Sequence, residues 1–361
     1  MKLQVTQANL SRALNTVARI ANTRNTLPIL ANVLIKTVDN RLSVSATNLD
    51  IGITHYVGSK IEKTGAITVP ARLTQDFVAS LPESVINLEL IDNKLHITTD
   101  KYNSTINGIA AEDFPVMPEI TAGTSWSLPS GELKKALTQT AFAASSDDSR
   151  PVLTGVYFHT DQKELSIAAT DSYRLAEKTL SKIKQDTALV VPGSATQDLL
   201  RVLGDGDEEV QITHDDQQIL FKTTDVNLVA RLIDGAYPDY RKLIPSKFET
   251  IATLKKEDLV GIAKVSSLFA RESAGSITIK AEAGSVSIKS IASQLGENTA
   301  TADADVKGGG EITLNSRYLL EGLAAFDGET IEFCFNGKLE PSVLRSPESK
   351  NYVHLVMPLR S

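Results

Sequence analysis

The sequence VPARLTQD at residues 69–76 returns 122 positions later as VPGSATQD at residues 191–198. Both copies begin with Val-Pro and end with Thr-Gln-Asp, and a related segment, LNSRY, occupies residues 314–318. We expect each of these segments to open a helix. Self-similarity at a near-constant interval is the mark of a repeated structural unit. The chain is therefore predicted to consist of three copies of one unit.

A second set of repeated positions lies upstream of these copies. In three segments, apolar or small residues fall at i, i+3, i+4, i+7 and i+11, which places them on one face of a helix. The positions are Leu10, Ala13, Leu14, Val17 and Ala21; Leu133, Ala136, Leu137, Thr140 and Ala144; and Leu259, Ile262, Ala263, Ser266 and Ala270. Each unit is thus expected to contain two helices, and the chain six.

Alternating segments rich in β-branched residues follow the first helix of each unit. They form pairs joined by short polar turns, which predicts β-hairpins at residues 33–46, 156–169 and 277–290. Strands in hairpin-linked groups favour antiparallel sheets covered on one face by paired helices, an α+β fold, over a doubly wound parallel sheet. The periodicity lapses at polar joints near residues 121–125 and 246–250, so we expect domains at 1–122, 123–248 and 249–361.

The length and composition of the chain are consistent with more than one domain, each with its own hydrophobic core. The chain has 361 residues, 42% of them hydrophobic and 22% charged, and domains typically hold about 100–200 residues. No apolar run approaches the roughly 20 residues that span a bilayer, and no signal-peptide core follows Met1. Cys334 is the only cysteine, which excludes an intrachain disulfide and a thiolate metal cage. We expect a cytoplasmic protein with no membrane partner.

Charge is distributed unevenly along the chain. The formal net charge of −7 argues against a tight grip on nucleic acid through bulk charge. The six predicted helices, however, hold 11 basic and six acidic residues, and the remainder holds 26 and 38. Their ranges are 9–20, 72–81, 130–144, 194–203, 255–271 and 315–326. A weakly positive helical face suits a surface that meets phosphate, although solvated helix faces also favour Lys and Arg.

Sequence signals for catalysis are weak. The five histidines are scattered without ligand spacing, and the sequence contains no phosphate-binding loop, dinucleotide fingerprint or nucleophile elbow. Gly308–Gly310 is expected to form a hairpin turn, residues 204–209 a solvated turn, and Cys334 to pack within a strand. The sequence therefore predicts a non-enzyme without catalytic residues, metal or cofactor.

Motifs along the whole chain resemble those of the bacterial DNA polymerase III beta subunit family, the replicative sliding clamps. The matching segments are TLPIL (26–30), TNLD (47–50), TVPAR (68–72), DFP (113–115), ATDSYRLA (169–176), YPDY (237–240) and VMPLR (356–360). The resemblance implies the DNA clamp fold, with three repeated domains in each subunit of a ring-forming, head-to-tail homodimer. It implies a nucleoid-associated processivity factor that encircles duplex DNA.

The resemblance also implies partners and a site that receives them. The partners would be the DNA polymerase III alpha subunit, the clamp loader complex, and other clamp-binding replication and repair proteins. Their peptides would occupy a pocket in the second domain at its junction with the third. The positions that match this pocket are Arg150, Leu153, Thr170, Asp171, Ser172, Tyr173, Arg174, Leu175, Pro238, Lys242, Leu243, Val343, Met357, Pro358, Leu359 and Arg360.

Within this set, each residue type suggests a role. Leu153, Leu175, Leu243, Val343 and Met357 would form an apolar floor, and the arginines would hold acidic or backbone oxygens of the peptide. An ordinary interface between domains, without a peptide site, would use the same apolar residues as part of its core. The segment Ser172-Tyr173 replaces Gly-His of some family members, which alters the expected rim contacts.

By the same resemblance, two further surfaces can be assigned. Residues expected near duplex DNA are Arg24, Arg72, Asn315 and Tyr318, whereas Gly193-Ser194 replaces a basic pair of the family. Residues expected at the dimer interface are Ser104, Ile106, Leu268 and Phe269. Two alternatives remain open on the residues alone. One is a repeat scaffold that binds peptide motifs without encircling DNA, and the other is a hydrolase with a diffuse site.

Overall fold

The computed structural model describes residues 1–21, 27–120, 122–292, 294 and 296–359. The chain divides into two compact units, one made of Met1–Gly131 with Gln197–Leu232 and the other of Glu132–Thr196 with Ile233–Ser361. In the described ranges, no helix is long and apolar enough to cross a membrane.

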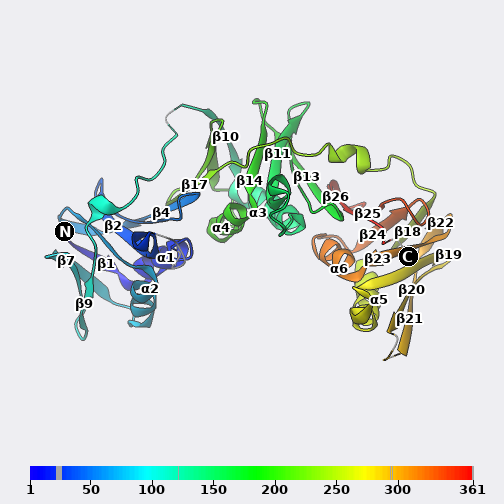
Figure 1. The fold of residues 1–361 in the computed structure, drawn as a ribbon, viewed down its shortest axis with the longest axis horizontal. Helices are drawn as coiled ribbons and strands as arrows, with labels where there is room; N and C mark the ends of the chain where they lie inside the picture. Colours follow the sequence, from blue (N-terminus) through cyan, green and yellow to red (C-terminus); the bar gives the residue numbers. More distant parts are fainter. Residues whose placement is uncertain (22–26, 121, 293, 295, 360–361) are drawn as a thin grey trace. The chain divides into compact units, whose positions relative to one another are not determined.

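The six predicted α-helices are all present, and each begins within two residues of its expected start (Figure 1). They are α1 (Gln7–Val17), α2 (Ala71–Ser80), α3 (Ser130–Thr140), α4 (Gly193–Val202), α5 (Lys256–Phe269) and α6 (Ser316–Ala324). The VPARLTQD segment and its relatives do open the second helix of each repeat, since α2, α4 and α6 begin inside them.

Helix α1 shows how the predicted face becomes a core. The Thr6 side chain accepts a hydrogen bond from the backbone N–H of Asn9, which caps the N-terminus. Leu10, Ala13, Leu14 and Val17 are at most 1% exposed. The helix ends at Val17, so Ala21, expected on this face, lies beyond it. In α5, Leu259, Ala263 and Ser266 are buried and Ile262 is half-buried.

In the first unit, the strands form two antiparallel sheets. The five-stranded sheet has the order β5-β1-β7-β8-β9, with β5 Lys60–Lys63, β1 Lys2–Thr6, β7 Val85–Ile91, β8 Lys94–Thr98 and β9 Asn103–Asn107. The eight-stranded sheet has the order β10-β15-β16-β17-β4-β3-β2-β6. Its strands are β10 Thr124–Pro129, β15 Glu209–His214, β16 Gln218–Lys222, β17 Val226–Arg231, β4 Ile51–Gly58, β3 Arg41–Thr47, β2 Asn32–Val38 and β6 Ala66–Pro70.

The eight-stranded sheet joins parts of the chain that the sequence assigns to different repeats. Strand β17 pairs with β4 from Val226↔His55 to Ala230↔Ile51. Helices α1 and α2 contact each other, and α1 packs on β3 and β4 (Figure 1). The helix layer therefore covers a sheet that runs from the first repeat into the second.

In the second unit, there are again two antiparallel sheets. The four-stranded sheet has the order β21-β20-β19-β23, with β21 Gly296–Asp303, β20 Ser285–Ala292, β19 Ser276–Glu282 and β23 Gly310–Asn315. The nine-stranded sheet has the order β14-β11-β12-β13-β26-β25-β24-β18-β22. Its strands are β14 Ala188–Pro192, β11 Gly155–Asp161, β12 Glu164–Thr170, β13 Arg174–Lys182, β26 Ser349–Val356, β25 Ser342–Ser346, β24 Thr330–Phe335, β18 Thr250–Lys255 and β22 Asp305–Lys307.

The nine-stranded sheet likewise connects the second repeat to the third. Strand β13 pairs with β26 from Arg174↔Val356 to Lys178↔Tyr352. Helix α6 contacts β26, and Gly322 permits this approach, because a Cβ there would lie 2.3 Å from Cδ2 of His354. The three predicted hairpins are confirmed as β2–β3, β11–β12 and β19–β20.

One turn prediction is wrong. Gly308–Gly310 does not close a hairpin, because β22 before it belongs to the nine-stranded sheet and β23 after it to the four-stranded sheet. Gly308 has φ +80°, and a Cβ at this position would lie 2.0 Å from the Glu249 carbonyl oxygen. Gly308 is needed because the chain changes sheets in a tight, left-handed bend against other backbone.

Candidate functional site

A pocket of about 340 Å³ opens in the second unit. Its lining comes from the short 3₁₀-helix at Pro151–Thr154, the end of β12 and the segment 236–243. The lining residues are Arg150, Pro151, Val152, Leu153, Thr170, Ser172, Ala236, Pro238, Tyr240 and Leu243. Most of them are apolar, and Arg150 supplies a cation. Leu243 is 50% exposed, so an apolar side chain stands open to a ligand.

Beneath the pocket, a buried cluster joins residues from the second and third repeats. It contains Ala168, Leu175, Tyr240, Cys334, Val343 and Leu355, with Tyr237 and Met357 packed against it. Burial raises the pKa of the Cys334 thiol to about 11. The floor of the pocket is therefore part of a continuous core. Because close-packed interiors leave little room for side chains to shift, the core holds the floor in one shape.

The segment 237–243 is fixed by polar contacts to neighbouring strands. The Tyr237 hydroxyl accepts a hydrogen bond from the Thr170 amide at 3.1 Å. The Tyr240 hydroxyl lies 2.6 Å from Nε2 of His159 and donates to Glu177. Burial, followed by the Glu177 charge, raises the pKa of Tyr240. These contacts hold the apolar wall in one geometry.

The rim of the pocket is a tight turn between β12 and β13. Oδ1 of Asp171 accepts hydrogen bonds from the amides of Tyr173 (2.9 Å) and Arg174 (3.0 Å). Ser172 has φ +77°, and its hydroxyl accepts from Nη1 of Arg150 at 3.2 Å. Asp side chains favour such hydrogen bonds to backbone amides two or three residues further along, which explains Asp171 at this turn.

The matching turn of the first repeat has the same design. Oδ1 of Asn48 accepts from the amides of Asp50 and Ile51, and Leu49 has φ +80°. The resemblance between residues 47–50 and 170–173 therefore reflects one turn geometry used twice.

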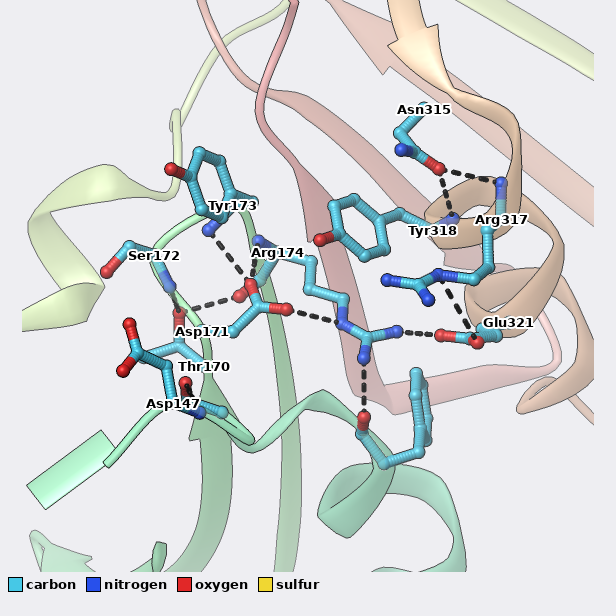
Figure 2. A network of polar contacts seen from close by, with 12 residues as sticks. Asp147, Thr170, Asp171, Ser172, Tyr173, Arg174, Asn315, Arg317, Tyr318 and Glu321 are labelled. Carbon is cyan, nitrogen blue, oxygen red and sulfur yellow. Dashed lines mark hydrogen bonds and ion pairs between the residues drawn. The ribbon is translucent and has the colours of Figure 1, made fainter. Parts of the chain in front are cut away.

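Arg174 connects this turn to helix α6 (Figure 2). Its side chain is 8% exposed, and each of its three nitrogens donates to an acceptor within the protein. Nε donates to Asp171 at 3.1 Å, Nη2 donates to the Phe142 carbonyl oxygen at 2.7 Å, and Nη1 donates to Glu321. The guanidinium also lies 4.7 Å from the Tyr318 ring centroid. Arg174 thus positions the turn against α6, and its expected contact with a peptide stays a prediction.

The structure places the remaining pocket residues around this lining. Leu175 and Val343 are buried in the cluster beneath it, and Met357 packs on that cluster while its amide donates to the Tyr173 carbonyl oxygen. Tyr173 is 61% exposed, and Lys242 pairs with Asp239 at 2.7 Å. Pro358 and Leu359 are half-buried, and the Leu359 amide donates to the Thr313 carbonyl oxygen. Arg360 lies outside the described residues.

Sequence reasoning missed four lining residues, Pro151, Val152, Ala236 and Tyr240. Tyr240 belongs to the YPDY motif and could have been found from it. Pro151 and Val152 directly follow Arg150, but nothing in their residue types signals a pocket wall.

Of the residues expected near DNA, the three that the structure describes lie at helix N-termini. Arg72 has a side chain 91% exposed in the first turn of α2. Asn315 is the N-cap of α6, because its side-chain oxygen accepts from the amides of Arg317 and Tyr318. The Tyr318 ring centroid lies 4.7 Å from the Arg174 guanidinium and 5.2 Å from that of Arg317 (Figure 2). Arg24 lies outside the described residues.

The four residues expected at a dimer interface differ in exposure. Leu268 is 53% exposed at the end of α5, and Phe269 is half-buried. Ser104 is half-buried and Ile106 is 6% exposed, both on β9, the last strand of the five-stranded sheet.

Known proteins match the chain along its full length. Models of the DNA polymerase III beta subunit match its N-terminal domain at residues 1–118, its central domain at 127–239 and its C-terminal domain at 241–360. The beta sliding clamp of Bacillus subtilis is 31% identical over 377 aligned residues, with 100% of each chain covered. That of Staphylococcus epidermidis is 28% identical, with 96% of each covered.

Solved structures agree. The DNA polymerase sliding clamp of Bacillus subtilis superposes with a TM-score of 0.95 at 29% identity, covering 100% of this chain and 99% of that one. A sliding clamp from Bartonella birtlesii bound to griselimycin has a TM-score of 0.95 at 28% identity, with full coverage of both chains.

Proposed function

This chain belongs to the DNA polymerase III beta subunit family and acts as a DNA sliding clamp, and we propose that it does so as a head-to-tail homodimeric ring around duplex DNA. Its similarity to named beta sliding clamps over the full length of both chains is the observation that carries this function. The protein is a non-catalytic processivity factor. Its repeats act as three domains, at residues 1–122, 123–248 and 249–361.

Ring closure uses strands that are left at the ends of sheets. Strand β9 ends the five-stranded sheet and β21 ends the four-stranded sheet. An end strand offers unpaired N–H and C=O groups that a strand of another subunit can complete. Leu268 and Phe269 lie on α5, which packs against β21, and Ser104 with Ile106 lie on β9. A head-to-tail contact closes into a ring when the rotation per subunit sums to a full turn.

The DNA passes through the ring without a tight grip. The excess of basic residues on the helices attracts phosphate, while the net charge of −7 keeps the attraction of the whole ring weak. Arg24, Arg72, Asn315 and Tyr318 are the proposed contacts. Polymerase held on such a ring stays at high effective concentration near the primer end.

The pocket described above receives peptides of the polymerase alpha subunit, the clamp loader and other clamp-binding proteins. Its apolar wall, including Leu153, Pro238 and Leu243, accepts apolar anchors, and Arg150 holds a carboxylate or carbonyl oxygen of the peptide. The hydrogen bonds of Tyr237 and Tyr240 already fix segment 237–243. Peptide binding therefore costs little conformational entropy in this segment.

Retention on closed DNA tests the topological function. The protein is placed on a nicked circular plasmid by its clamp loader with ATP and is then separated by gel filtration. We expect co-elution with the circle and release after a restriction enzyme linearises it. A protein that stays bound to the linear product, as a peptide-binding scaffold with ordinary DNA affinity would, contradicts the ring.

A matched pair of leucine variants tests the pocket. Leu243→Ala removes a half-exposed side chain of the lining, and Leu339→Ala removes a side chain that is 76% exposed and outside it. Loss of one apolar anchor contact of about 1.5 kcal/mol weakens a polymerase-derived peptide about tenfold. We expect this loss in Leu243→Ala alone, measured by fluorescence anisotropy. Equal affinities for the two variants would place the peptide elsewhere.

A further inference from the structure

Two polar side chains lie behind the wall of the peptide pocket. They are His159 on β11 and Glu177 on β13, and neither is among the lining residues. His159 is 8% exposed, and the side chain of Glu177 is 12% exposed. Both contact Tyr240, which does line the pocket. An effect of these two residues on a bound peptide would therefore pass through Tyr240.

Tyr240 belongs to the pocket and to the sheet beneath it. It packs in the buried cluster that includes Val343 and Leu355. Its hydroxyl lies 2.6 Å from Nε2 of His159 and donates to Oε2 of Glu177. These two contacts fix the position of a side chain that a peptide would meet.

Each group in this network can donate or accept in only one direction. Burial, followed by the charge of Glu177, raises the pKa of Tyr240, so the phenol keeps its proton. An ionised carboxylate only accepts hydrogen bonds, so the phenol proton points to Glu177. Burial, followed by the charge of Arg241, lowers the pKa of His159, which leaves the imidazole neutral at pH 7. The contact between His159 and the Tyr240 oxygen then requires the imidazole proton to be on Nε2.

Arg241 holds the carboxylate of this network in place. Its Nε donates to Oε2 of Glu177 at 3.1 Å, its Nη1 donates to Asp161, and its Nη2 donates to the Ser166 hydroxyl at 3.1 Å. These partners lie on β13, β11 and β12, so one guanidinium ties the segment 237–243 to three strands. A carboxylate bound in this way cannot turn from the phenol without losing a charge-assisted hydrogen bond.

We propose that Glu177 and His159 are positioning residues for peptide binding, because they hold the Tyr240 hydroxyl from behind and thereby preset the wall of the pocket. The inference rests on the proposed function, since the ligand is a peptide of a clamp-binding protein. It places two determinants of affinity outside the lining. A wall that is not held has to be ordered when the peptide binds, and this ordering lowers the affinity.

Three variants of the full-length protein test the network. Glu177→Met removes the acceptor of the phenol proton, Glu177→Gln keeps an acceptor of the same shape, and Tyr240→Phe removes the hydroxyl but keeps the ring. The matched control is Glu332→Met. Glu332 lies on β24 of the same sheet, outside the pocket lining, and accepts from Nε of Arg345 at 2.6 Å. The control therefore also removes a carboxylate that is paired with an arginine.

Anisotropy of a fluorescein-labelled, polymerase-derived peptide gives the affinity of each variant. We expect Kd to rise about threefold to tenfold in Glu177→Met and Tyr240→Phe, and to stay within about twofold of the wild type in Glu177→Gln and Glu332→Met. Equal losses in Glu177→Met and Glu332→Met would show a general effect of ion-pair loss and overturn the proposal. An unchanged Kd in Tyr240→Phe would also overturn it, and this variant decides the case if Glu177→Met does not fold.

The tautomer of His159 is a second readout, which a merely structural role of Glu177 would not change. At pH 7, the ring ¹⁵N shifts of histidine-labelled wild-type protein should show the His159 proton on Nε2. In Glu177→Met, the phenol can donate only to His159, so the imidazole proton should move to Nδ1. A tautomer that is the same in both proteins would show that the carboxylate does not order the network, and would overturn the proposal.

The variant Leu243→Ala separates this proposal from the peptide site itself. If Leu243→Ala weakens the peptide while Glu177→Met and Tyr240→Phe do not, the pocket stands and the positioning role is wrong. Unchanged affinity in all three variants would place the peptide elsewhere and remove the pocket as well.

Discussion

Replacement of Arg174 by Ala should destabilise the second unit far more than replacement of its partner Glu321 by Gln. Arg174 is 7% exposed and donates to Asp171, Glu321 and the Phe142 carbonyl oxygen. Its removal leaves the Asp171 carboxylate, which has little access to water, without its cation, and breaking a buried ion pair costs about 3–5 kcal/mol.

The environment of each acceptor refines that magnitude. The Asp171 side chain is 12% exposed, but that of Glu321 is 39% exposed, so solvent can replace the arginine at Glu321. We therefore expect about 3 kcal/mol for Arg174→Ala and about 1 kcal/mol or less for Glu321→Gln. Arg174→Lys should fall between them, because one ammonium cannot reach three acceptors that a planar fork reaches.

Urea unfolding with two probes measures these values. Trp126, the only tryptophan, lies on β10 in the first unit and reports on that unit, whereas far-ultraviolet circular dichroism reports on both. For a slope of about 3 kcal/mol per molar urea, the Arg174→Ala midpoint should fall by about 1 M in the dichroism signal. The Trp126 midpoint should move much less.

Two results would refute the reasoning. A loss of stability in Glu321→Gln equal to that in Arg174→Ala would show that the ion pair, rather than the stranded buried acceptors, carries the energy. Equal shifts of both probes would show that the contact is not local to the second unit.

The remaining predictions concern buried groups. Burial and the nearby Arg174 lower the pKa of His354 to about 3, so the unfolded chain takes up the proton first and stability is lost as pH falls below about 7. Between pH 7 and 5, the wild type should lose about 2 kcal/mol more than His354→Leu in urea titrations, and parallel pH profiles would contradict this. The buried thiol of Cys334, with its pKa raised to about 11, should react with iodoacetamide at pH 8 at least about 100-fold more slowly than in the urea-unfolded chain, as followed by mass spectrometry. Gly322→Ala should cost about 1–3 kcal/mol in urea unfolding, because its Cβ meets His354, whereas Gly261→Ala, with open space around it, should not destabilise.

Local structure was predictable because it depends on residues that are close in the sequence. Periodic apolar positions predicted α1, α3 and α5 together with the buried face of each helix. The hairpins at residues 33–46, 156–169 and 277–290 followed from two alternating segments and the short turn between them. In each case the deciding signal lies within about 15 residues.

The pocket was predicted only in part, because its members act through contacts between distant segments. Family motifs placed Arg150, Thr170 and Leu243 near one another, and the structure brings them to one lining. The same motifs could not show that the Arg174 guanidinium faces away toward α6, since Glu321 lies 147 residues along the chain. The residue type shows that Arg174 carries a positive charge. The position of its guanidinium, however, depends on its contacts with Asp171 and Glu321.

The sequence by itself determined the threefold repeat, the six helices, the α+β class and the family. Helix periodicity and hairpin turns depend on residues that are near one another along the chain, and the order of the motifs can be read from the sequence directly. Only the tertiary structure decided that β17 pairs with β4 and β13 with β26, so that each large sheet joins two repeats. It also decided that His159 and Glu177 meet at the Tyr240 hydroxyl. Backbone pairing between distant strands and the convergence of polar side chains depend on how elements pack, which no local pattern records.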